Sequence, residues 1–173
     1  FVDRDDYTDG AEFVSTNDNV VMLKTFSKIY GMAGLRLGWM YAPDGVVDII
    51  NRMRSPFNVS YSAIVAGIAA TKDDNFIKLS QEHNKKWLKW TTDKIRALNL
   101  VVPDSVCNFV LVRFPKNTVN GLSAKAADDF LKAKGIIVRR MGGYGLPDAL
   151  RISIGTEEEM RITVNTLAKY VSV

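Results

Sequence analysis

Apolar and polar positions follow two different periods along the chain, and together they predict an α/β protein. Continuous apolar runs predict strands over 20–26, 38–42, 108–114, 136–138 and 150–154. Apolar residues at helical spacing predict helices over 46–54, 60–71, 75–98, 124–134 and 157–170, with a loop and a short helix within 3–19. The run at 20–26 is apolar enough to predict a buried strand, and Thr156 followed by three glutamates predicts a capped helix start.

The order of these elements predicts two parts of different kinds. Residues 1–97 are expected to form the latter part of a large α/β domain together with a long connecting helix. Residues 98–173 are expected to form a small α+β C-terminal domain. Trp87 and Trp90 lie three positions apart on one face of the long helix, which favours packing in a core over stacking on a ligand.

The composition excludes several kinds of site. With one cysteine and one histidine, the 173-residue chain has no intramolecular disulfide and no metal site made of several histidines or cysteines. Cys107 lies in an apolar run and is predicted to be a buried thiol, while His83 is predicted to be a solvated helix residue. The net charge of +4 is modest and no basic tract stands out, so we expect no nucleic-acid partner, no metal and no membrane anchor. A reducing cytoplasm fits this composition.

The densest chemistry lies at 25–39, directly after the first predicted strand. Lys28 offers an amine that can attack a carbonyl group once it is deprotonated. Thr25 and Ser27 offer hydroxyl groups and Arg36 a planar fork, all suited to binding a phosphate group. The segment therefore predicts a site for a phosphorylated carbonyl cofactor, pyridoxal phosphate, bound covalently to Lys28. A solvated lysine beside an ordinary glycine-rich turn is the simpler alternative.

The whole string, Thr25-Phe26-Ser27-Lys28 followed by Gly34-Leu35-Arg36-Leu37-Gly38, resembles the lysine segment of the class II aminotransferases of fold type I. In that family an arginine follows the lysine by eight positions, as Arg36 follows Lys28 here. The resemblance implies that Lys28 is the catalytic lysine that binds pyridoxal 5'-phosphate and moves a proton. It also implies that Thr25, Ser27 and Arg36 bind the cofactor phosphate.

A second segment, Tyr144-Gly145-Leu146-Pro147 followed by Leu150-Arg151-Ile152-Ser153-Ile154-Gly155, resembles the small domain of the same family. By itself, an arginine within an apolar strand can simply lie on a solvated sheet face. The resemblance implies that Arg151 binds the carboxylate, or an equivalent anionic group, of the substrate. Arg139 and Arg140 are left unassigned, because two adjacent arginines are more often surface charge than part of a site for a phosphorylated substrate.

The resemblance extends over the whole chain and is best to the histidinol-phosphate aminotransferases, which belong to histidine biosynthesis. It implies a homodimer that transfers an amino group from histidinol phosphate to 2-oxoglutarate. Aromatic amino-acid aminotransferases, threonine-phosphate decarboxylases and non-catalytic regulators built on the same scaffold are the alternatives. In the family an Asp-Glu-Ala-Tyr element precedes the position of Phe1, so we expect a C-terminal piece of a longer enzyme, inactive by itself.

Overall fold

The computed structural model describes residues 1, 6–115 and 121–172, so positions 3–5 of the predicted N-terminal loop lie outside the described residues. Contacts between Cα atoms divide the chain into two compact units. One contains Val2–Gln81 and the other contains Glu82–Val173 together with Phe1. The division falls within the helix α4 (Asp74–Arg96), whereas the domain boundary expected before residue 98 stays a prediction.

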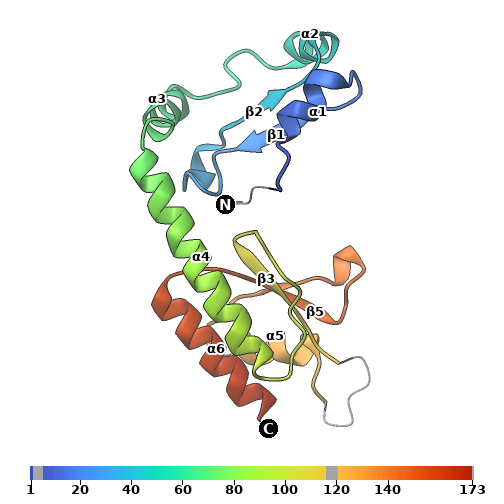
Figure 1. Cartoon of the computed structure of the whole chain (residues 1–173), viewed down its shortest axis with the longest axis vertical. Coiled ribbons are helices and arrows are strands. Elements are labelled where there is room, and N and C mark those ends of the chain that lie inside the picture. Colours follow the sequence, from blue (N-terminus) through green and yellow to red (C-terminus); the bar gives the residue numbers. More distant parts are fainter. Residues whose placement is uncertain (2–5, 116–120, 173) are drawn as a thin grey trace. The chain divides into compact units, whose positions relative to one another are not determined.

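The first unit, Val2–Gln81, is built around a two-stranded antiparallel sheet (Figure 1). Its strands β1 and β2 pair with Met22 opposite Tyr41 and Thr25 opposite Gly38. Before the start of α4, its elements are α1 (Gly10–Thr16), β1 (Met22–Thr25), the 3-10 turn η1 (Ala33–Leu35), β2 (Gly38–Tyr41), α2 (Asp44–Met53) and α3 (Tyr61–Ala70).

The prediction that the strand over 20–26 is buried was wrong. Leu23 is 72% exposed and Val21 is 41% exposed, and only Phe26 of this run is buried. The reason is that β1 pairs only with β2 among the described residues. A sheet of two strands leaves many of its apolar side chains open to solvent. The apolar sequence is that of an interior strand, and the described chain leaves it on the surface.

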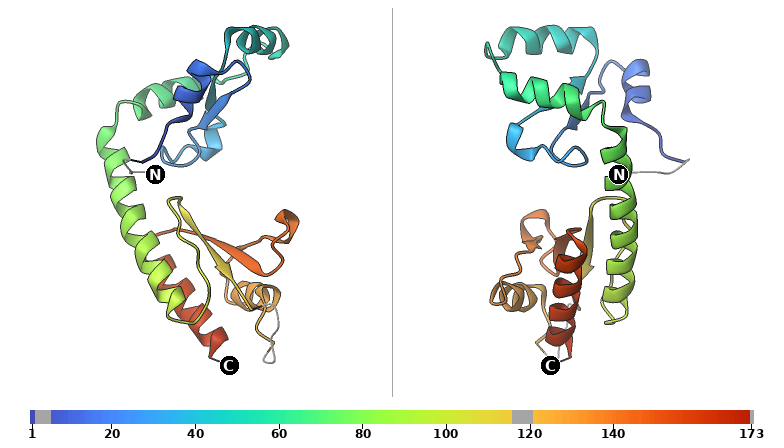
Figure 2. Two further views of the ribbon diagram at one scale, coloured as in Figure 1. Left: turned by 45° about the vertical axis from the view of Figure 1, so that its right-hand side comes forward. Right: turned by 90° about the vertical axis from the view of Figure 1, so that its left-hand side faces the viewer.

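In its described residues, the second unit, Glu82–Val173, combines three helices with an antiparallel sheet of strand order β3-β5-β4 (Figures 1 and 2). Leu111 on β3 and Arg139 on β4 both lie opposite Arg151 on β5. After α4, the elements are β3 (Phe109–Arg113), α5 (Ala124–Lys132), β4 (Arg139–Arg140), the 3-10 turn η2 (Gly142–Tyr144), β5 (Ala149–Ser153) and α6 (Glu157–Val171).

The core of the second unit lies on one face of this sheet. Val110, Val112, Leu150 and Ile152 point to that face and are at most 3% exposed. They form one apolar cluster with residues of all three helices, namely Trp87 and Ile95 of α4, Ala124, Ala127 and Leu131 of α5, and Met160, Val164 and Leu167 of α6. Since α4, α5 and α6 all pack on this face, no helix of the described residues covers the opposite face of the sheet.

The predicted role of the two tryptophans is confirmed. Trp87 is 3% exposed and its ring meets that of Trp90 edge-on, with 5.1 Å between the ring centres. Arg161 of α6 lies over both rings, at 5.4 Å from Trp87 and 5.3 Å from Trp90. The pair therefore joins α4 to α6.

Two local predictions were wrong. Cys107 is exposed, because the chain turns before β3, and Ser105 Oγ accepts the backbone N–H of Cys107 within that turn. Residues 136–138 are not a strand; pairing begins only at Arg139. In both places the apolar run begins before the residues that pair as a strand. No helix of the described chain is long and apolar enough to cross a membrane.

The core face predicts where substitutions will destabilise the protein. Leu150→Ala removes a fully buried side chain, and such truncations cost about 2–5 kcal/mol of the free energy of unfolding. The matched variant Leu23→Ala removes the same atoms from a side chain that is 72% exposed, and it should cost less than about 0.5 kcal/mol. Urea denaturation followed by tryptophan fluorescence measures both, and equal losses would contradict the proposed core.

The start of α6 predicts a pH dependence of stability. The backbone N–H of Thr156 donates to Glu159 Oε2 at 2.7 Å, and this bond together with the Thr156 hydroxyl lowers the pKa of Glu159. A lowered folded pKa stabilises the protein above the ordinary carboxyl pKa, and that contribution is lost as the pH falls through the folded value. Glu159→Gln should reduce the loss of unfolding free energy between about pH 6 and pH 3. Glu158→Gln, on the same turn, should leave that loss unchanged. Denaturation curves at both pH values test this.

Candidate active site

Lys28 lies on the loop that joins β1 to β2. The antiparallel register continues past the strands, because the Phe26 N–H donates to the Leu37 carbonyl at 3.0 Å. The Met32 N–H then donates back to the Phe26 carbonyl at 2.9 Å, which closes the loop on itself. Ser27 directly follows Phe26 and Arg36 directly precedes Leu37, so both leave the strand pair at this end. The loop thus brings the predicted hydroxyl and guanidinium groups to the same end of the strand pair.

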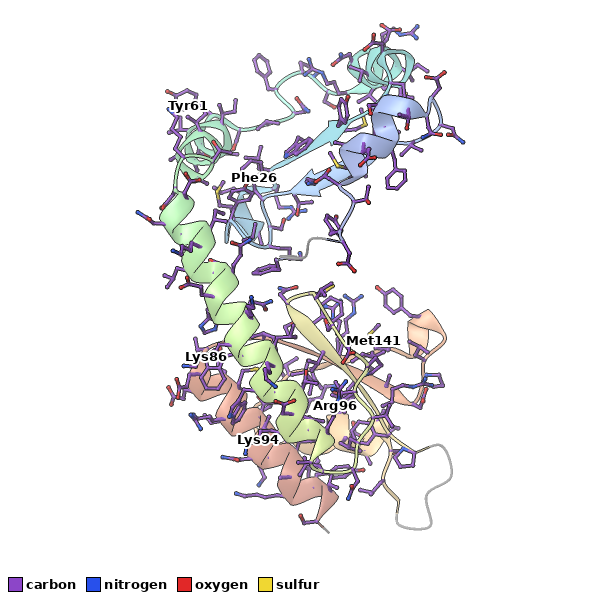
Figure 3. All side chains as sticks on the ribbon, in the orientation of Figure 1. Phe26, Tyr61, Lys86, Lys94, Arg96 and Met141 are labelled. Carbon is purple, nitrogen blue, oxygen red and sulfur yellow. The ribbon has the colours of Figure 1, made fainter. Side chains whose placement is uncertain are left out.

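Packing on α3 holds the base of this loop. Phe26 is buried and its ring lies 4.7 Å from that of Tyr30, measured between ring centres (Figure 3). Leu37 packs against α3 at Gly67, where a Cβ atom would lie 2.6 Å from Leu37 Cδ2. A side chain at position 67 would force Leu37 to shift, so the glycine of α3 lets the base of the loop pack closely on this helix.

The polar groups of the loop have few partners. Arg36 adopts a left-handed backbone conformation with φ of 55°, and its Nη1 donates to the Ala33 carbonyl at 2.8 Å. The remaining guanidinium N–H groups have no acceptor in the described chain. Lys28 is exposed, and Gly31 turns the backbone after it by donating its N–H to the Lys28 carbonyl at 2.9 Å. An amine, two hydroxyls and a largely free guanidinium fit a phosphorylated aldehyde.

The neighbouring Lys24 is a different kind of lysine. Its Nζ lies 2.8 Å from Asp9 Oδ2, and this hydrogen bond raises the pKa of Lys24. The same bond lowers the pKa of Asp9, whose other carboxylate oxygen caps α1 by accepting the Ala11 N–H at 2.8 Å. The Lys24 amine is therefore protonated and engaged. Of the two lysines, Lys28 is the candidate nucleophile.

Arg151 lies on the uncovered face of the second unit's sheet. Its neighbours on β5, Leu150 and Ile152, point into the core, so Arg151 points the other way. Its guanidinium carbon lies 5.1 Å from the centre of the Phe109 ring. Its Nε is buried and has no hydrogen-bond partner among the residues that the structure describes. A buried guanidinium N–H without an acceptor is costly, and an anionic ligand would satisfy it.

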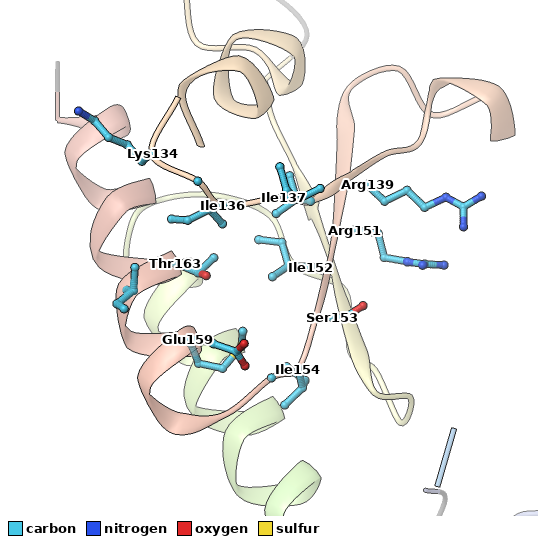
Figure 4. A pocket seen from close by; sticks show the side chains of 15 residues that line it. Lys134, Ile136, Ile137, Arg139, Arg151, Ile152, Ser153, Ile154, Glu159 and Thr163 are labelled. Atoms are coloured by element: carbon cyan, nitrogen blue, oxygen red, sulfur yellow. The ribbon is translucent and has the colours of Figure 1, made fainter. Parts of the chain in front are cut away.

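Arg139 shares this face, which the sequence could not show. It lies directly opposite Arg151 across β4 and β5, and the two side chains extend together away from α6 (Figure 4). No carboxylate pairs with either arginine within the described residues. Arg140 lies opposite Leu150 instead. The pKa of Asp129 is lowered mainly by its hydrogen bond from Lys125, and the charge of Arg140 lowers it further. The register of β4 therefore separates two arginines that are adjacent in sequence.

The chain is similar to known proteins over nearly its whole length. Residues 1–167 match the family described as aminotransferase class I and II. The chain is 53% identical over 171 residues to the histidinol-phosphate aminotransferase of Paramagnetospirillum magneticum and 46% identical over 172 residues to that of Rhodopseudomonas palustris. Each comparison covers 99% of this chain and 47% of the relative, so the chain spans about half the length of these curated relatives.

A solved structure shows the same fold. The histidinol-phosphate aminotransferase of Sinorhizobium meliloti in complex with pyridoxal-5'-phosphate is 27% identical, with a TM-score of 0.83. The superposition covers 94% of this chain and 44% of that one. The α/β aminotransferase fold expected from the lysine segment is thereby confirmed. On the family match over nearly its whole length, this chain belongs to the class I and II aminotransferases.

Proposed function

We propose that this chain provides the lysine-bearing part of a pyridoxal-phosphate-dependent aminotransferase that acts on histidinol phosphate and 2-oxoglutarate. The observation that carries the proposal is the β1–β2 connection closed by the backbone hydrogen bonds of Phe26, which carries Ser27, Lys28 and Arg36 directly after Thr25. The specific reaction follows from the two curated relatives at 53% and 46% identity, both histidinol-phosphate aminotransferases. Those names favour it over the aromatic aminotransferase, decarboxylase and regulator alternatives.

Some residues of the loop bind the cofactor, and Lys28 also transfers a proton. Thr25 and Ser27 donate hydroxyl hydrogen bonds to the cofactor phosphate, and the unpaired N–H groups of Arg36 bind it as a fork. Lys28 holds the cofactor covalently through Nζ. When bound, pyridoxal phosphate supplies an electron sink for the substrate carbon. The Lys28 amine, free once the substrate amine has displaced it, would take the proton from the amine-bearing carbon of the substrate, a positioned transfer typically worth about 10²–10⁴ in rate.

The two arginines of the second unit bind the anionic end of the substrate. Like charges placed directly opposite each other across a sheet destabilise it unless an anion lies between them. A phosphate monoester has enough oxygens to accept from Arg151 and Arg139 together, and histidinol phosphate carries such a group. A carboxylate of 2-oxoglutarate suits the guanidinium fork of Arg151.

The activity, the homodimer and the cytoplasmic location are proposals for the whole enzyme, of which this chain matches about half. We expect the 173-residue chain alone to show no turnover with histidinol phosphate and 2-oxoglutarate. Turnover by the isolated chain would contradict this. In a protein of the relatives' full length, transfer from histidinol phosphate should exceed transfer from aromatic amino acids, and threonine phosphate should not be decarboxylated.

The role of Lys28 predicts selective labelling. Incubation of the chain with pyridoxal phosphate and reduction with borohydride should attach the cofactor to Lys28 in preference to Lys24, because the Lys24 amine is held protonated by Asp9. Peptide mass spectrometry measures the site of attachment. Lys28→Ala should abolish this label, and Lys24→Ala should leave it unchanged. Equal labelling of all lysines would contradict a built site.

The role of the arginines predicts binding of a phosphate monoester. The chain should bind phenyl phosphate, and Arg151→Gln or Arg139→Gln should weaken binding about tenfold or more through loss of a charge-assisted contact. Arg140→Gln removes the same charge from the adjacent residue on the other face and should have little effect. NMR titrations that follow the arginine Nε–H signals measure the affinity for phenyl phosphate of the unchanged chain and of the three variants. Equal weakening by Arg140→Gln would indicate charge alone and contradict a site.

A further inference from the structure

We infer that Tyr144 is the positioning residue that makes the arginine pair selective for phosphate over carboxylate. The inference rests on the proposed function, since it assigns a role within the substrate-binding face. Tyr144 is 62% exposed, so burial in a core does not explain an aromatic residue at this position. What it contacts is Arg139.

Tyr144 holds the guanidinium of Arg139 in two ways. The Tyr144 hydroxyl accepts a hydrogen bond from Arg139 Nη2 at 2.8 Å. The Arg139 guanidinium carbon also lies 5.3 Å from the centre of the Tyr144 ring, within the range of a cation–π contact. An exposed arginine on an edge strand otherwise samples many rotamers, and the charge of Arg151 directly opposite would drive it away.

The tyrosine itself is fixed by the connection between β4 and β5. The N–H groups of Tyr144 and Leu146 both donate to the Met141 carbonyl, at 2.9 and 3.2 Å. Gly145 follows with φ of 75°, a left-handed conformation that favours glycine, and it ends η2. The Met141 N–H donates to the Ala149 carbonyl at 3.2 Å, which ties the connection to the start of β5. A short, internally hydrogen-bonded turn therefore sets the position of the Tyr144 ring.

Each arginine of the pair rests on its own aromatic ring. Arg151 lies over Phe109 and Arg139 lies over Tyr144, at 5.1 and 5.3 Å. The two rings differ in one respect, because only the tyrosine offers a hydroxyl acceptor. A carboxylate needs a single fork and is satisfied by Arg151. A phosphate dianion gains from a second guanidinium held at a fixed place, and that place depends on Tyr144.

The test compares phenyl phosphate with benzoate, two ligands that differ in the anionic group on the same ring. Tyr144→Phe keeps the aromatic ring and removes the acceptor. It should weaken phenyl phosphate binding about three- to tenfold, as expected for one charge-assisted hydrogen bond at an exposed site, and leave benzoate binding unchanged. Tyr144→Ala should weaken phenyl phosphate further. The matched control is Tyr61→Phe, because Tyr61 is 81% exposed and lies in the other unit.

NMR titration of the 173-residue chain measures affinity and reports the Arg139 Nε–H signal directly. We expect that signal to move in Tyr144→Phe before any ligand is added, while the amide signals of Val110 and Ile152 stay in place. Unchanged affinity for phenyl phosphate in Tyr144→Phe, with Arg139→Gln still weakened, overturns the inference and leaves the proposed site standing. Equal weakening of both ligands overturns the selectivity. No binding of phenyl phosphate by the unchanged chain overturns both the site and the inference.

Discussion

Alternate residues of β5 point to opposite faces of the sheet, and the helices of the described residues pack on one of these faces. The proposed anionic site depends on this alternation. Leu150 and Ile152 are buried among the three helices. The residue between them must point to the other face. Arg151 occupies that position, and its Nε lacks a hydrogen-bond partner in the described part of the chain. Moving this arginine by one position would bury its charge in the core at a prohibitive cost.

The lysine loop depends on a different constraint, the closure of a strand pair by backbone hydrogen bonds. Phe26 uses its N–H to extend the register to Leu37 and its carbonyl to fold the loop tip back. Its buried ring then anchors the same residue beside α3. Lys28 follows two positions later, so its location is set by an apolar residue that takes no part in chemistry. The polar groups can remain largely unpaired because packing, and not their own bonds, holds the loop.

The sequence predicted the elements well where local rules decide them. The helix at the C-terminus begins with the predicted cap, because Thr156 and Glu159 form a reciprocal capping box. The stop of α5 near Gly135, with φ of 77°, follows the same local logic. Burial was harder to predict, because it depends on what else covers a strand. Leu23 is exposed and Cys107 lies outside the strand that its apolar neighbours predicted.

The candidate site divides in the same way. A resemblance in sequence indicated Lys28, Arg36 and Arg151, but it left Arg139 and Arg140 equivalent. Only the strand register separates them, and register is a property of pairing partners distant in the chain. The spacing of residues did not predict the contact of Tyr144 with Arg139. That contact forms only because the turn at η2 brings the Tyr144 hydroxyl to the Arg139 guanidinium. A residue that orients another residue leaves no pattern of its own, and so the contact itself is the first sign of it.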